Sequence, residues 1–385
     1  MKRSILCSLM ISLSLFSTLF AQQTISGSFP SNGQTRSYLG AVPDDPQTPL
    51  RLVILFCGAG ENASQMVLRG FNNFLGNNTM VIYPEPFNGT PGFDLSTDVD
   101  DYQMVEDLIT EVASNYTIDT SDICIGGFSN GGIFTYNVVC DFNSTGSSRA
   151  YTFKAFAVVS GAMEDGTANI IDCPVSGTIP LIAFHGTQDP IIGYTGSFIP
   201  PPVNILTEPA DTTLGFWATT INDCNSTPTV TALPDVVSET PNSTADLLEY
   251  NCTSSPNTVF YRINGGFHAW PGGNANLDIA QARNMDINAS ELIADFFENP
   301  TTVSTNHVNT DPGILSVYPN PVKDVLSIET TYNLKQVEIF NTIGKMVFAS
   351  EQPDYAIPLD HLTAGTYFLR IETDAGTTIK KIIKN

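Results

Sequence analysis

Short apolar runs alternate with amphipathic segments from residue 24 to residue 298. Residues 50–56, LRLVILF, form a nearly continuous apolar run, which is typical of a strand buried on both faces of a parallel sheet. From residue 100 to 115 the apolar positions recur at helical spacing, and Asp100 or Asp101 stands where a helix cap is expected. Further strand-like runs and a closing amphipathic helix are expected at 80–83, 123–125, 155–159, 180–184, 258–263 and 287–297. The alternation predicts an α/β fold with a mostly parallel sheet flanked by helices.

The pattern changes after residue 298. Residues 299–312 are polar with few hydrophobic side chains, which indicates a linker. Beyond them, short alternating runs separated by turns predict a small all-β, sandwich-like C-terminal domain over residues 313–385. The α/β domain is therefore expected to span residues 22–298. Within it, the proline-rich residues 191–213 are expected to form an ordered loop over one end of the sheet.

Residues 1–21 have the pattern of a secretory signal peptide. Lys2 and Arg3 precede an apolar stretch that runs to Phe20, and the small residue Ala21 marks the expected cleavage point. No later run approaches the ~18–20 apolar residues of a membrane-spanning helix. The mature chain is therefore expected to be exported and to have no membrane span.

Export changes how the cysteines are interpreted. Cys7 leaves with the signal peptide, and an even number of cysteines in an oxidising compartment favours disulfides over metal ligation. No C-x-x-C spacing suggests a zinc site, so no metal is expected. Cys57 and Cys124 lie in strand-like runs and fit either a further bridge or free buried thiols. The two expected bridges join Cys224 to Cys252 and Cys140 to Cys173.

The charge of the chain excludes some partners. It holds 39 Asp and Glu against 16 Lys and Arg, a net charge of −23. Such an acidic chain repels nucleic acid and anionic membrane surfaces, so neither is an expected partner. The usual origin of this excess is a well-solvated exported surface, and it carries no information about the chemistry.

Residues 123–133, ICIGGFSNGGI, contain the first candidate for chemistry. An apolar run meets a glycine-rich turn with Ser129 at its apex, and apolar positions resume after it. In the G-x-S-x-G pattern from Gly127 to Gly131, a strand turns sharply into a helix, which pushes the serine oxygen outward and strains its backbone. An ordinary serine in a strand-to-helix turn has the same pattern, so the rest of the chain must decide.

A serine hydroxyl needs a base within hydrogen-bond reach, and the base needs an orienting acid. Two histidines of the α/β domain qualify: His185 directly follows a strand, and His268 lies in the glycine-rich loop NGGFHAWPGG. Asp189 follows the same strand as His185. The order Ser129, Asp189, His268 is that of nucleophile, acid and base in α/β-hydrolases, so these three are the predicted catalytic residues. His185 is expected to be structural and to bond the backbone of the acid loop.

Each of these residues has an alternative interpretation. Asp189 stands before a proline and fits a turn-forming aspartate, and His268 fits a loop histidine packed on Trp270. Asp172 and Asp223 are competing acids, but neither directly follows a strong strand. Three residues in the right order, each after a predicted strand, favour the catalytic interpretation.

Acyl transfer also needs two backbone donors for the oxyanion. One is the amide of Asn130, and the other is expected in residues 56–64, FCGAGENAS, where the amide of Ala59 is favoured. The same stretch fits a turn leading into a helix capped by Asn62 or Ser64, and the two interpretations are compatible. Four aromatic residues near these motifs are expected to line the substrate pocket: Phe128, Tyr194, Phe198 and Trp270.

Four segments resemble a known family. They are residues 127–132 (GFSNGG), 184–194 (FHGTQDPIIGY), 216–224 (FWATTINDC) and 261–272 (YRINGGFHAWPG). Over roughly residues 25–298 the chain resembles the secreted α/β-hydrolase esterases grouped with poly(3-hydroxybutyrate) depolymerases, feruloyl esterases and acetyl xylan esterases.

This resemblance implies the same triad, with Ser129 as nucleophile, Asp189 as acid and His268 as base. It also supports the bridge from Cys224 to Cys252. The family usually has His-Gly where this chain has Cys57-Gly58, and that departure affects local hydrogen bonding rather than the backbone donor.

The C-terminal domain has a resemblance of its own. Its blocks SVYPNP (316–321), VEIFNTIGK (337–345) and LTAGTYFL (362–369), followed by a basic end, resemble the C-terminal sorting domain of the type IX secretion system of Bacteroidetes. The resemblance implies passage across the outer membrane through contacts of residues 313–385 with the secretion machinery. A carbohydrate-binding sandwich is a weaker alternative, because the aromatic residues are scattered and this domain has no tryptophan.

The sequence therefore predicts a secreted carboxylic ester hydrolase that works through an acyl-enzyme, with no metal or organic cofactor. The favoured substrates are feruloyl or acetyl esters on plant polysaccharide, and poly(3-hydroxybutyrate) or a related polyester is the alternative. A function of another class is a non-catalytic surface binding protein on a hydrolase scaffold. The acyl group depends on pocket shape, which these motifs do not specify.

Overall fold

The computed structural model describes residues 22–300 and 316–384, each with gaps. The first range omits residues 88–91, 94, 96–99, 166–172, 200–204, 236, 238–241, 253–257 and 274–282. The second omits residues 319–321, 331–332, 342–345, 351–354, 364 and 374–375. The expected signal peptide, most of the expected linker and the competing acid Asp172 lie outside the described residues.

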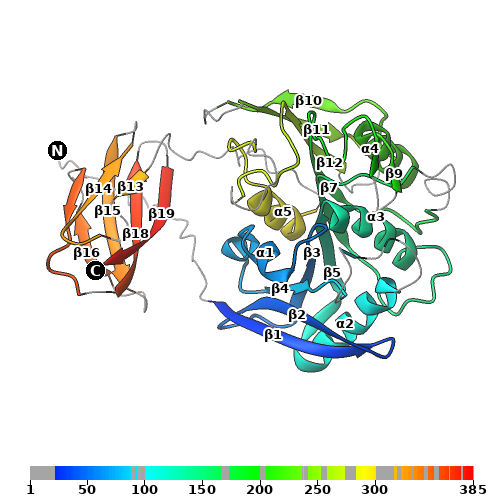
Figure 1. Cartoon of the computed structure of the whole chain (residues 1–385), viewed down its shortest axis with the longest axis horizontal. Helices are drawn as coiled ribbons and strands as arrows, with labels where there is room; N and C mark the ends of the chain where they lie inside the picture. The colour runs from blue at the N-terminus through cyan, green and yellow to red at the C-terminus, as the bar shows by residue number, and fades with distance from the viewer. Residues whose placement is uncertain are drawn as a thin grey trace, which may run out of the picture.

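The described strands of residues 22–300 include one mixed sheet, parallel in the middle and antiparallel at both edges (Figure 1). The six central strands pair in parallel, and the flanking strands pair in antiparallel fashion. The apolar runs occupy this parallel centre, where both faces are covered, and the expected fold class is confirmed. In spatial order the strands are β1 (Gln22–Ser31), β2 (Gln34–Pro43), β4 (Thr79–Pro84), β3 (Leu50–Phe56), β5 (Ile118–Phe128), β6 (Ala155–Val159), β7 (Leu181–Gly186), β12 (Thr258–Asn264), β11 (Thr244–Tyr250) and β10 (Thr229–Ala232).

Helices cover both faces of the sheet. In Figure 1, α1 and α5 lie on one side of the central strands, and α2 and α3 lie on the other. The Asp100 carboxylate accepts the Gln103 amide at 3.0 Å, and Asn62 and Gln65 form a capping box on α1, so both expected caps are confirmed. The helices are α1 (Ala63–Val67), the 3-10 turn η1 (Phe71–Phe74), α2 (Asp101–Asn115), α3 (Asn130–Phe142), α4 (Ala210–Phe216) with its π-helical continuation η2 (Trp217–Ile221), and α5 (Ala289–Glu298).

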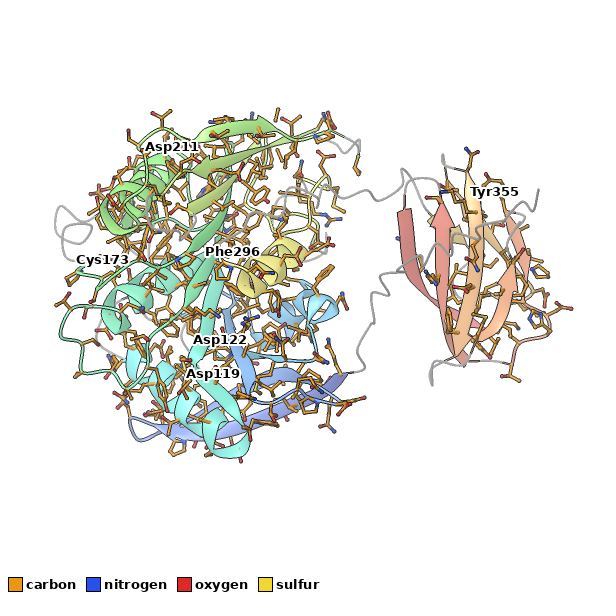
Figure 2. The ribbon with its side chains drawn as sticks, turned by 180° about the vertical axis from the view of Figure 1, so that it is seen from behind. Asp119, Asp122, Cys173, Asp211, Phe296 and Tyr355 are labelled. Carbon is orange, nitrogen blue, oxygen red and sulfur yellow. A yellow bond between two sulfur atoms is a disulfide. The ribbon has the colours of Figure 1, made fainter. Side chains whose placement is uncertain are left out.

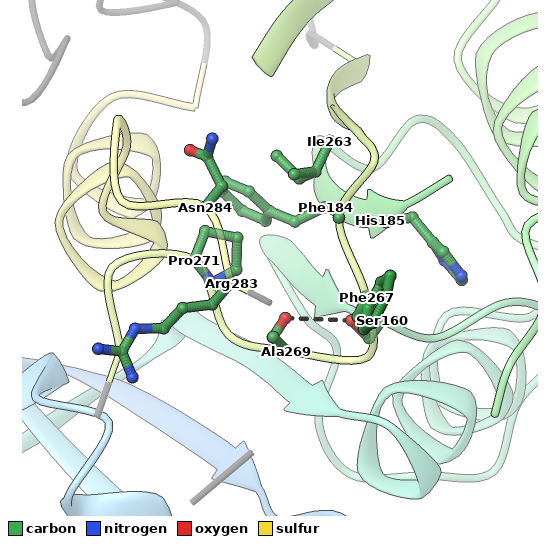
Figure 3. A pocket seen from close by; sticks show the side chains of 11 residues that line it. Ser160, Phe184, His185, Ile263, Phe267, Ala269, Pro271, Arg283 and Asn284 are labelled. Carbon is green, nitrogen blue, oxygen red and sulfur yellow. Dashed lines mark hydrogen bonds between the residues drawn. The ribbon is translucent and has the colours of Figure 1, made fainter. Parts of the chain in front are cut away.

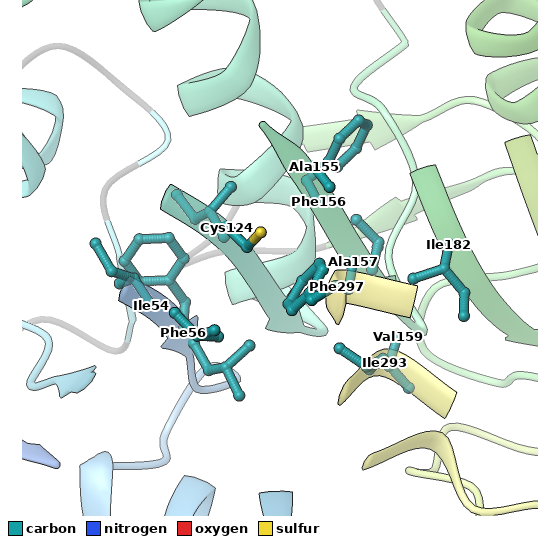
Figure 4. Close-up of a cluster of buried hydrophobic side chains, with 14 of the residues drawn as sticks. Ile54, Phe56, Cys124, Ala155, Phe156, Ala157, Val159, Ile182, Ile293 and Phe297 are labelled. Carbon is teal, nitrogen blue, oxygen red and sulfur yellow. The ribbon is translucent and has the colours of Figure 1, made fainter. Parts of the chain in front are cut away.

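In the main core, α5 packs against the central strands. Figure 4 shows Ile293 and Phe297 of α5 close to Ala157, Val159 and Ile182 of β6 and β7, and all five are buried. Burial of an Ile or Phe side chain contributes about 1.5–3 kcal/mol. This rigid centre positions the loops that leave the carboxyl ends of the strands.

Residues 191–213 differ from the loop expected there. They contain a short antiparallel hairpin of β8 (Ser197–Ile199) and β9 (Ile205–Thr207), and α4 begins at Ala210. The hairpin pairs main-chain groups that an irregular loop would leave to water. Strands β10 and β11 were not expected either, and β10 is exposed along its whole length.

Both expected disulfides are confirmed. Cys140 at the end of α3 is bonded to Cys173, which is labelled in Figure 2, and Cys224 is bonded to Cys252. Cys57 and Cys124 are free and buried, which settles the alternative left open for them. Burial raises the pKa of the Cys124 thiol to about 12 and raises the pKa of the Cys57 thiol as well. Both are therefore unreactive core residues near neutral pH.

The C-terminal residues form two antiparallel sheets with a core of their own. Leu326 and Ile357 of the smaller sheet and Ile339, Leu369 and Ile382 of the larger sheet are buried in one cluster. The expected small all-β domain is confirmed. The strands are β13 (Ser316–Tyr318), β14 (Val325–Glu329) and β17 (Ala356–Pro358) in one sheet, and β16 (Met346–Ser350), β15 (Leu334–Asn341), β18 (Gly365–Thr373) and β19 (Gly376–Lys384) in the other.

Candidate active site

Ser129 stands at the sharp turn between β5 and α3. Its backbone has φ 56° and ψ −121°, a conformation that non-glycine residues rarely adopt. The turn is tight enough to require glycines: a Cβ on Gly127 would lie 2.2 Å from the Gly131 carbonyl oxygen, and one on Gly131 would lie 2.5 Å from the Cys57 oxygen. The Ser129 amide donates to the Val159 carbonyl at 3.0 Å, which ties the turn to β6.

The three sequence-predicted residues of the triad lie in hydrogen-bond contact. His268 Nε2 is 2.8 Å from Ser129 Oγ, and His268 Nδ1 is 2.7 Å from Asp189 Oδ2. Ser129 follows β5, Asp189 follows β7, and His268 follows β12, so all three come from the carboxyl edge of the parallel strands. All three are at least nine-tenths buried. In such a low-dielectric setting these polar contacts are stronger than in water.

The second oxygen of Asp189 is also engaged. Its Oδ1 accepts the amides of Ile191 at 2.8 Å and Ile192 at 2.9 Å. These two donors fix the rotation of the carboxyl group, so that Oδ2 faces the His268 ring. A carboxylate held in this way orients the imidazole and selects the tautomer that leaves Nε2 free to accept a proton.

His185 lies behind the acid loop. Its Nε2 is 2.7 Å from the Ile192 carbonyl oxygen and 3.6 Å from Asp189 Oδ2. Burial lowers the pKa of His185, although Asp189 acts in the opposite direction, and the neutral ring donates its Nε2 proton to the Ile192 carbonyl. The expected bond from His185 to the backbone of the acid loop is confirmed. Figure 3 shows the ring turned away from the small cavity, of about 10 Å³, that His185 borders.

The histidine loop is tied to the neighbouring strand as well. The Ser160 hydroxyl, at the end of β6, donates to the carbonyl of Ala269 at 3.2 Å (Figure 3). Ser160 is fully buried and has a positive φ of 49°. Ala269 directly follows His268, so this bond helps to fix the position of His268.

The loop that follows β3 lies against the serine turn. A Cβ added to Gly58 would meet Ser129 Cβ at 3.2 Å and Phe128 Cδ1 at 3.1 Å. The Gly58 amide donates to Glu61 Oε2 at 2.9 Å, so it is not available to an oxyanion. Ala59, the next residue, is exposed.

Asn130 contributes more than its main chain. Its side chain accepts the Phe93 amide at 2.8 Å and donates to the Phe93 carbonyl at 3.2 Å. A Cβ on Gly92 would lie 2.3 Å from Asn130 Oδ1 and 3.4 Å from Ala59 Cα, so Asn130 and Ala59 both border Gly92. Within the described part of the chain, neither the Asn130 nor the Ala59 amide donates to a protein group.

The four aromatic residues expected in the substrate pocket fall into different settings. Phe128 and Trp270 are almost fully buried, and Trp270 donates to Ser290 Oγ at 3.0 Å, so these two side chains support the loops instead of presenting a surface. Tyr194 is partly buried and donates its hydroxyl to Asp211. Phe198 is 56% exposed on β8.

The sequence patterns missed two charged residues of this region. Arg69 is buried and forms an ion pair with Glu61, the residue that accepts the Gly58 amide. Arg69 belongs to no motif, and its one signal in the sequence is that basic residues are rare in this acidic chain.

No group of metal-binding side chains occurs in the described parts of the chain. Nor do they contain a helix long and apolar enough to cross a membrane.

Two family models match parts of this chain. Residues 97–197, which include Ser129 and Asp189, match the family described as phospholipase/carboxylesterase. Residues 316–385 match the secretion system C-terminal sorting domain. The two matched ranges do not overlap: one lies within the α/β part and the other covers the C-terminal sheets. His268 lies outside both matched ranges, so its place beside Ser129 rests on geometry alone.

Several curated proteins are similar to parts of this chain. Feruloyl esterase B of Piromyces equi is 27% identical over 189 residues, which cover 48% of this chain and 32% of that protein. Feruloyl esterase D of Neurospora crassa is 28% identical over 194 residues, which cover 46% and 60%. A bifunctional acetylxylan esterase/xylanase of Neocallimastix patriciarum is 30% identical over 115 residues, covering 30% and 15%. The chain thus spans less than two thirds of the length of these relatives.

Two solved structures that align with this chain are named as esterases. An acetyl xylan esterase from Aspergillus awamori aligns with a TM-score of 0.43 and 15% identity, over 64% of this chain and 94% of that one. A feruloyl esterase module from Clostridium thermocellum aligns with a TM-score of 0.36 and 20% identity, over 44% and 68%.

Proposed function

We propose that this protein is a secreted carboxylic ester hydrolase that works through a Ser-His-Asp triad. The observation that carries the proposal is the hydrogen-bonded series from Asp189 through His268 to Ser129, with distances of 2.7 and 2.8 Å. A buried serine at a strained turn, beside a histidine that an aspartate orients, is the arrangement that activates a hydroxyl for acyl transfer.

In the first half of the reaction, His268 Nε2 takes the proton of the Ser129 hydroxyl while Oγ attacks the ester carbonyl. A bond forms between Oγ and the carbonyl carbon, and the carbonyl oxygen becomes an oxyanion. Asp189 stabilises the imidazolium without taking its proton. The imidazolium then gives that proton to the alcohol as it leaves, and the acyl group remains on Ser129.

The amides of Ala59 and Asn130 are the proposed oxyanion donors. They border the same glycine, Gly92, and have no protein acceptor within the described residues. Main-chain donors that the fold already holds in place need no reorganisation when the charge develops, and one such donor contributes a factor of about 10²–10³ to kcat. In the second half, His268 takes a proton from a water molecule, whose oxygen attacks the acyl carbon. The bond from that carbon to Ser129 Oγ then breaks, His268 returns the proton to Oγ, and the acid is released.

For the substrate we favour feruloyl or acetyl esters on plant polysaccharide, because the named relatives are feruloyl and acetylxylan esterases. A polymeric substrate suits an exported enzyme, and the sorting tail supports export with residues 1–21 as the proposed signal peptide. Hydrolysis of poly(3-hydroxybutyrate) or a related polyester is the alternative substrate choice.

The test compares the wild-type protein with Ser129→Ala on p-nitrophenyl acetate. The expected result is a fall in kcat of at least about 10⁴-fold, because loss of the nucleophile removes the acyl-enzyme route. Equal rates for the two proteins would instead support a binding protein on a hydrolase scaffold. A parallel assay on methyl ferulate, acetylated xylan and a polyhydroxybutyrate suspension then chooses among the substrates.

A further inference from the structure

Arg69 is a buried cation at the junction of the three loops that form the proposed active site. It lies in the chain between α1 and η1, and only 3% of its surface is exposed. A cation so deeply buried requires compensation from charge and hydrogen-bond partners. Arg69 has contacts with the loop after β3, with the serine turn and with the histidine loop.

Its first contact is with the loop after β3. Arg69 Nη2 pairs with Glu61 Oε1, and the other carboxylate oxygen, Oε2, accepts the Gly58 amide at 2.9 Å. Because the guanidinium holds one oxygen of Glu61, the second oxygen is held where it fixes the Gly58 amide. The peptide that follows carries the Ala59 amide, so the ion pair sets the direction in which this proposed oxyanion donor points.

Its second contact is with the residue before the nucleophile. Arg69 Cζ lies 3.8 Å from the ring centroid of Phe128, and the Phe128 and His268 ring centroids are 5.0 Å apart. A guanidinium stacked on an aromatic face is attracted by the ring, more strongly when both are out of water. The Phe128 ring is thus packed near both the Arg69 cation and the proposed base.

Its third contact is with the histidine loop. Arg69 Cζ lies 5.5 Å from the ring centroid of Trp270, two residues after His268. The Trp270 indole donates to Ser290 Oγ at 3.0 Å, and the Ser290 hydroxyl donates to the Arg69 carbonyl at 2.9 Å. Both ends of Arg69, its guanidinium and its main chain, therefore support the position of Trp270.

We propose that Arg69 is a positioning residue that holds the oxyanion loop, the nucleophile and the base in mutual register. The proposal rests on the ester hydrolase function proposed above and adds a residue to it. Arg69 is buried and is not expected to touch substrate, so it acts on the rate of acyl transfer through Glu61, Phe128 and Trp270. Lysine does not replace it, because an ammonium lacks the planar fork that pairs with a carboxylate while stacking on rings.

The experiment uses the full-length protein and four variants: Arg69→Met, Arg69→Lys, Glu61→Gln and the matched control Arg51→Met. Arg51 is also buried and ion-paired, with Asp122 at 2.9 Å and with Glu298, but it lies at the opposite, amino end of the central strands. Asp122 is labelled in Figure 2. The control therefore loses a buried cation without touching the proposed site.

The readouts are kcat and KM on p-nitrophenyl acetate and the thermal midpoint. We expect Arg69→Met to lower kcat about 10–100-fold with KM changed less than threefold, because misplacing one oxyanion donor costs up to about 10²–10³-fold. Arg69→Lys is expected to recover less than half of the loss on a logarithmic scale. Glu61→Gln keeps an acceptor for the Gly58 amide and is expected to lower kcat about 3–10-fold. Arg51→Met is expected to lower the thermal midpoint with kcat unchanged.

The proposal is overturned if Arg69→Met and Arg51→Met lose the same fraction of kcat, or if Arg69→Met raises KM and leaves kcat unchanged. If Arg69→Met does not fold, a kcat for Glu61→Gln equal to that of the wild-type protein also overturns the proposal. If the wild-type protein shows no turnover that depends on Ser129, the hydrolase function fails and amide hydrogen exchange decides about Arg69. Faster exchange of residues 57–62 in Glu61→Gln than in Arg51→Met then supports the hold on the loop, and equal exchange refutes it.

Discussion

Ser129 has a backbone conformation that only its glycine neighbours make possible. Of the two glycines that flank Ser129, Gly131 packs against the end of β3. A Cβ on Gly131 would lie within 2.8 Å of three main-chain atoms of Phe56 and Cys57. Main-chain atoms of a central strand do not move aside as a flexible side chain does. Room at this position is therefore a condition for the turn itself.

Gly131→Ala is expected to destabilise the protein by about 3 kcal/mol, the upper end of the usual cost of overpacking. It is also expected to lower kcat on p-nitrophenyl acetate, because the strand and the turn must separate. Gly215→Ala in α4 is the control: outside the backbone of its own helix no described atom lies within 4 Å of its added Cβ, and alanine favours a helix by up to about 1 kcal/mol. Urea unfolding measures the stability of both variants, and equal unfolding midpoints for Gly131→Ala and Gly215→Ala would contradict the prediction.

His185 gives the fold a dependence on acid pH. Its pKa in the folded protein is lowered by burial, whereas an unfolded histidine has a pKa of about 6.5. Below that pH the unfolded chain takes up a proton that the folded chain does not, so stability falls as pH decreases through the window below about 6.5 and is level above it.

His185→Gln removes this proton uptake and keeps a donor for the Ile192 carbonyl. Between pH 6.5 and 5 the wild-type protein is expected to lose up to about 1.4 kcal/mol per pH unit more than the variant. Urea titrations at several pH values give both curves. Parallel curves for the two proteins would show that His185 does not titrate in this way.

At the scale of elements, the two disulfides hold segments that the sheet does not. The bridge from Cys140 to Cys173 closes 33 residues and links the end of α3 to a loop before β7, and the bridge from Cys224 to Cys252 closes 28. Closing a loop of this length restricts the unfolded chain more than the folded one. Neither bridge belongs to the triad loops, so their contribution is to stability.

The double variant Cys140→Ala, Cys173→Ala is expected to lower the free energy of unfolding by about 3–4 kcal/mol with kcat unchanged. Guanidinium unfolding of the two proteins measures the difference. Dithiothreitol should lower the unfolding midpoint of the wild-type protein more than that of the variant, because the wild-type protein has two bridges to reduce and the variant has one. An unchanged midpoint in the variant would mean that this bridge contributes nothing.

Elements with a strong apolar signature were predictable from the sequence. The run 155–159 is the whole of β6, because a strand buried on both faces has no polar residue to blur its limits. The three residues of the proposed triad could be selected from the sequence because each lies in the loop or turn after such a strand. The β8–β9 hairpin and β10 were not predictable from the sequence. The strands of the hairpin are too short to show a pattern, and β10 is exposed along its whole length.

The support of the site escaped prediction for a different reason. Arg69 meets Glu61 at a separation of 8 residues and Ser290 at 221, so no spacing in the sequence marks their contact. The same holds for the two hydrogen bonds between the Asn130 side chain and the main chain of Phe93. Contacts of this kind depend on how loops meet in space, and only the folded chain brings them together.

At the scale of the whole molecule, besides two small apolar clusters, the described residues form two large hydrophobic cores that share no side chain. One belongs to the α/β part and the other to the C-terminal sheets. A truncated protein that ends at residue 300 is therefore expected to unfold within about 1 kcal/mol of the α/β transition of the full chain, with the same kcat, since surface cuts away from a core have small effects. Chemical unfolding and the p-nitrophenyl acetate assay test this expectation, and a large loss of either would contradict it.

The proposed triad joins distant parts of the chain: Ser129 and His268 are 139 residues apart, and Asp189 and His268 are 79 apart. Contacts of such separation form slowly, because a long stretch of chain must be ordered before they meet. Recovery of ester turnover after dilution from denaturant should therefore lag behind the return of helical circular dichroism. By the proposed mechanism, a growing chain gains ester turnover only after its residue 268 has been made and has folded against Ser129.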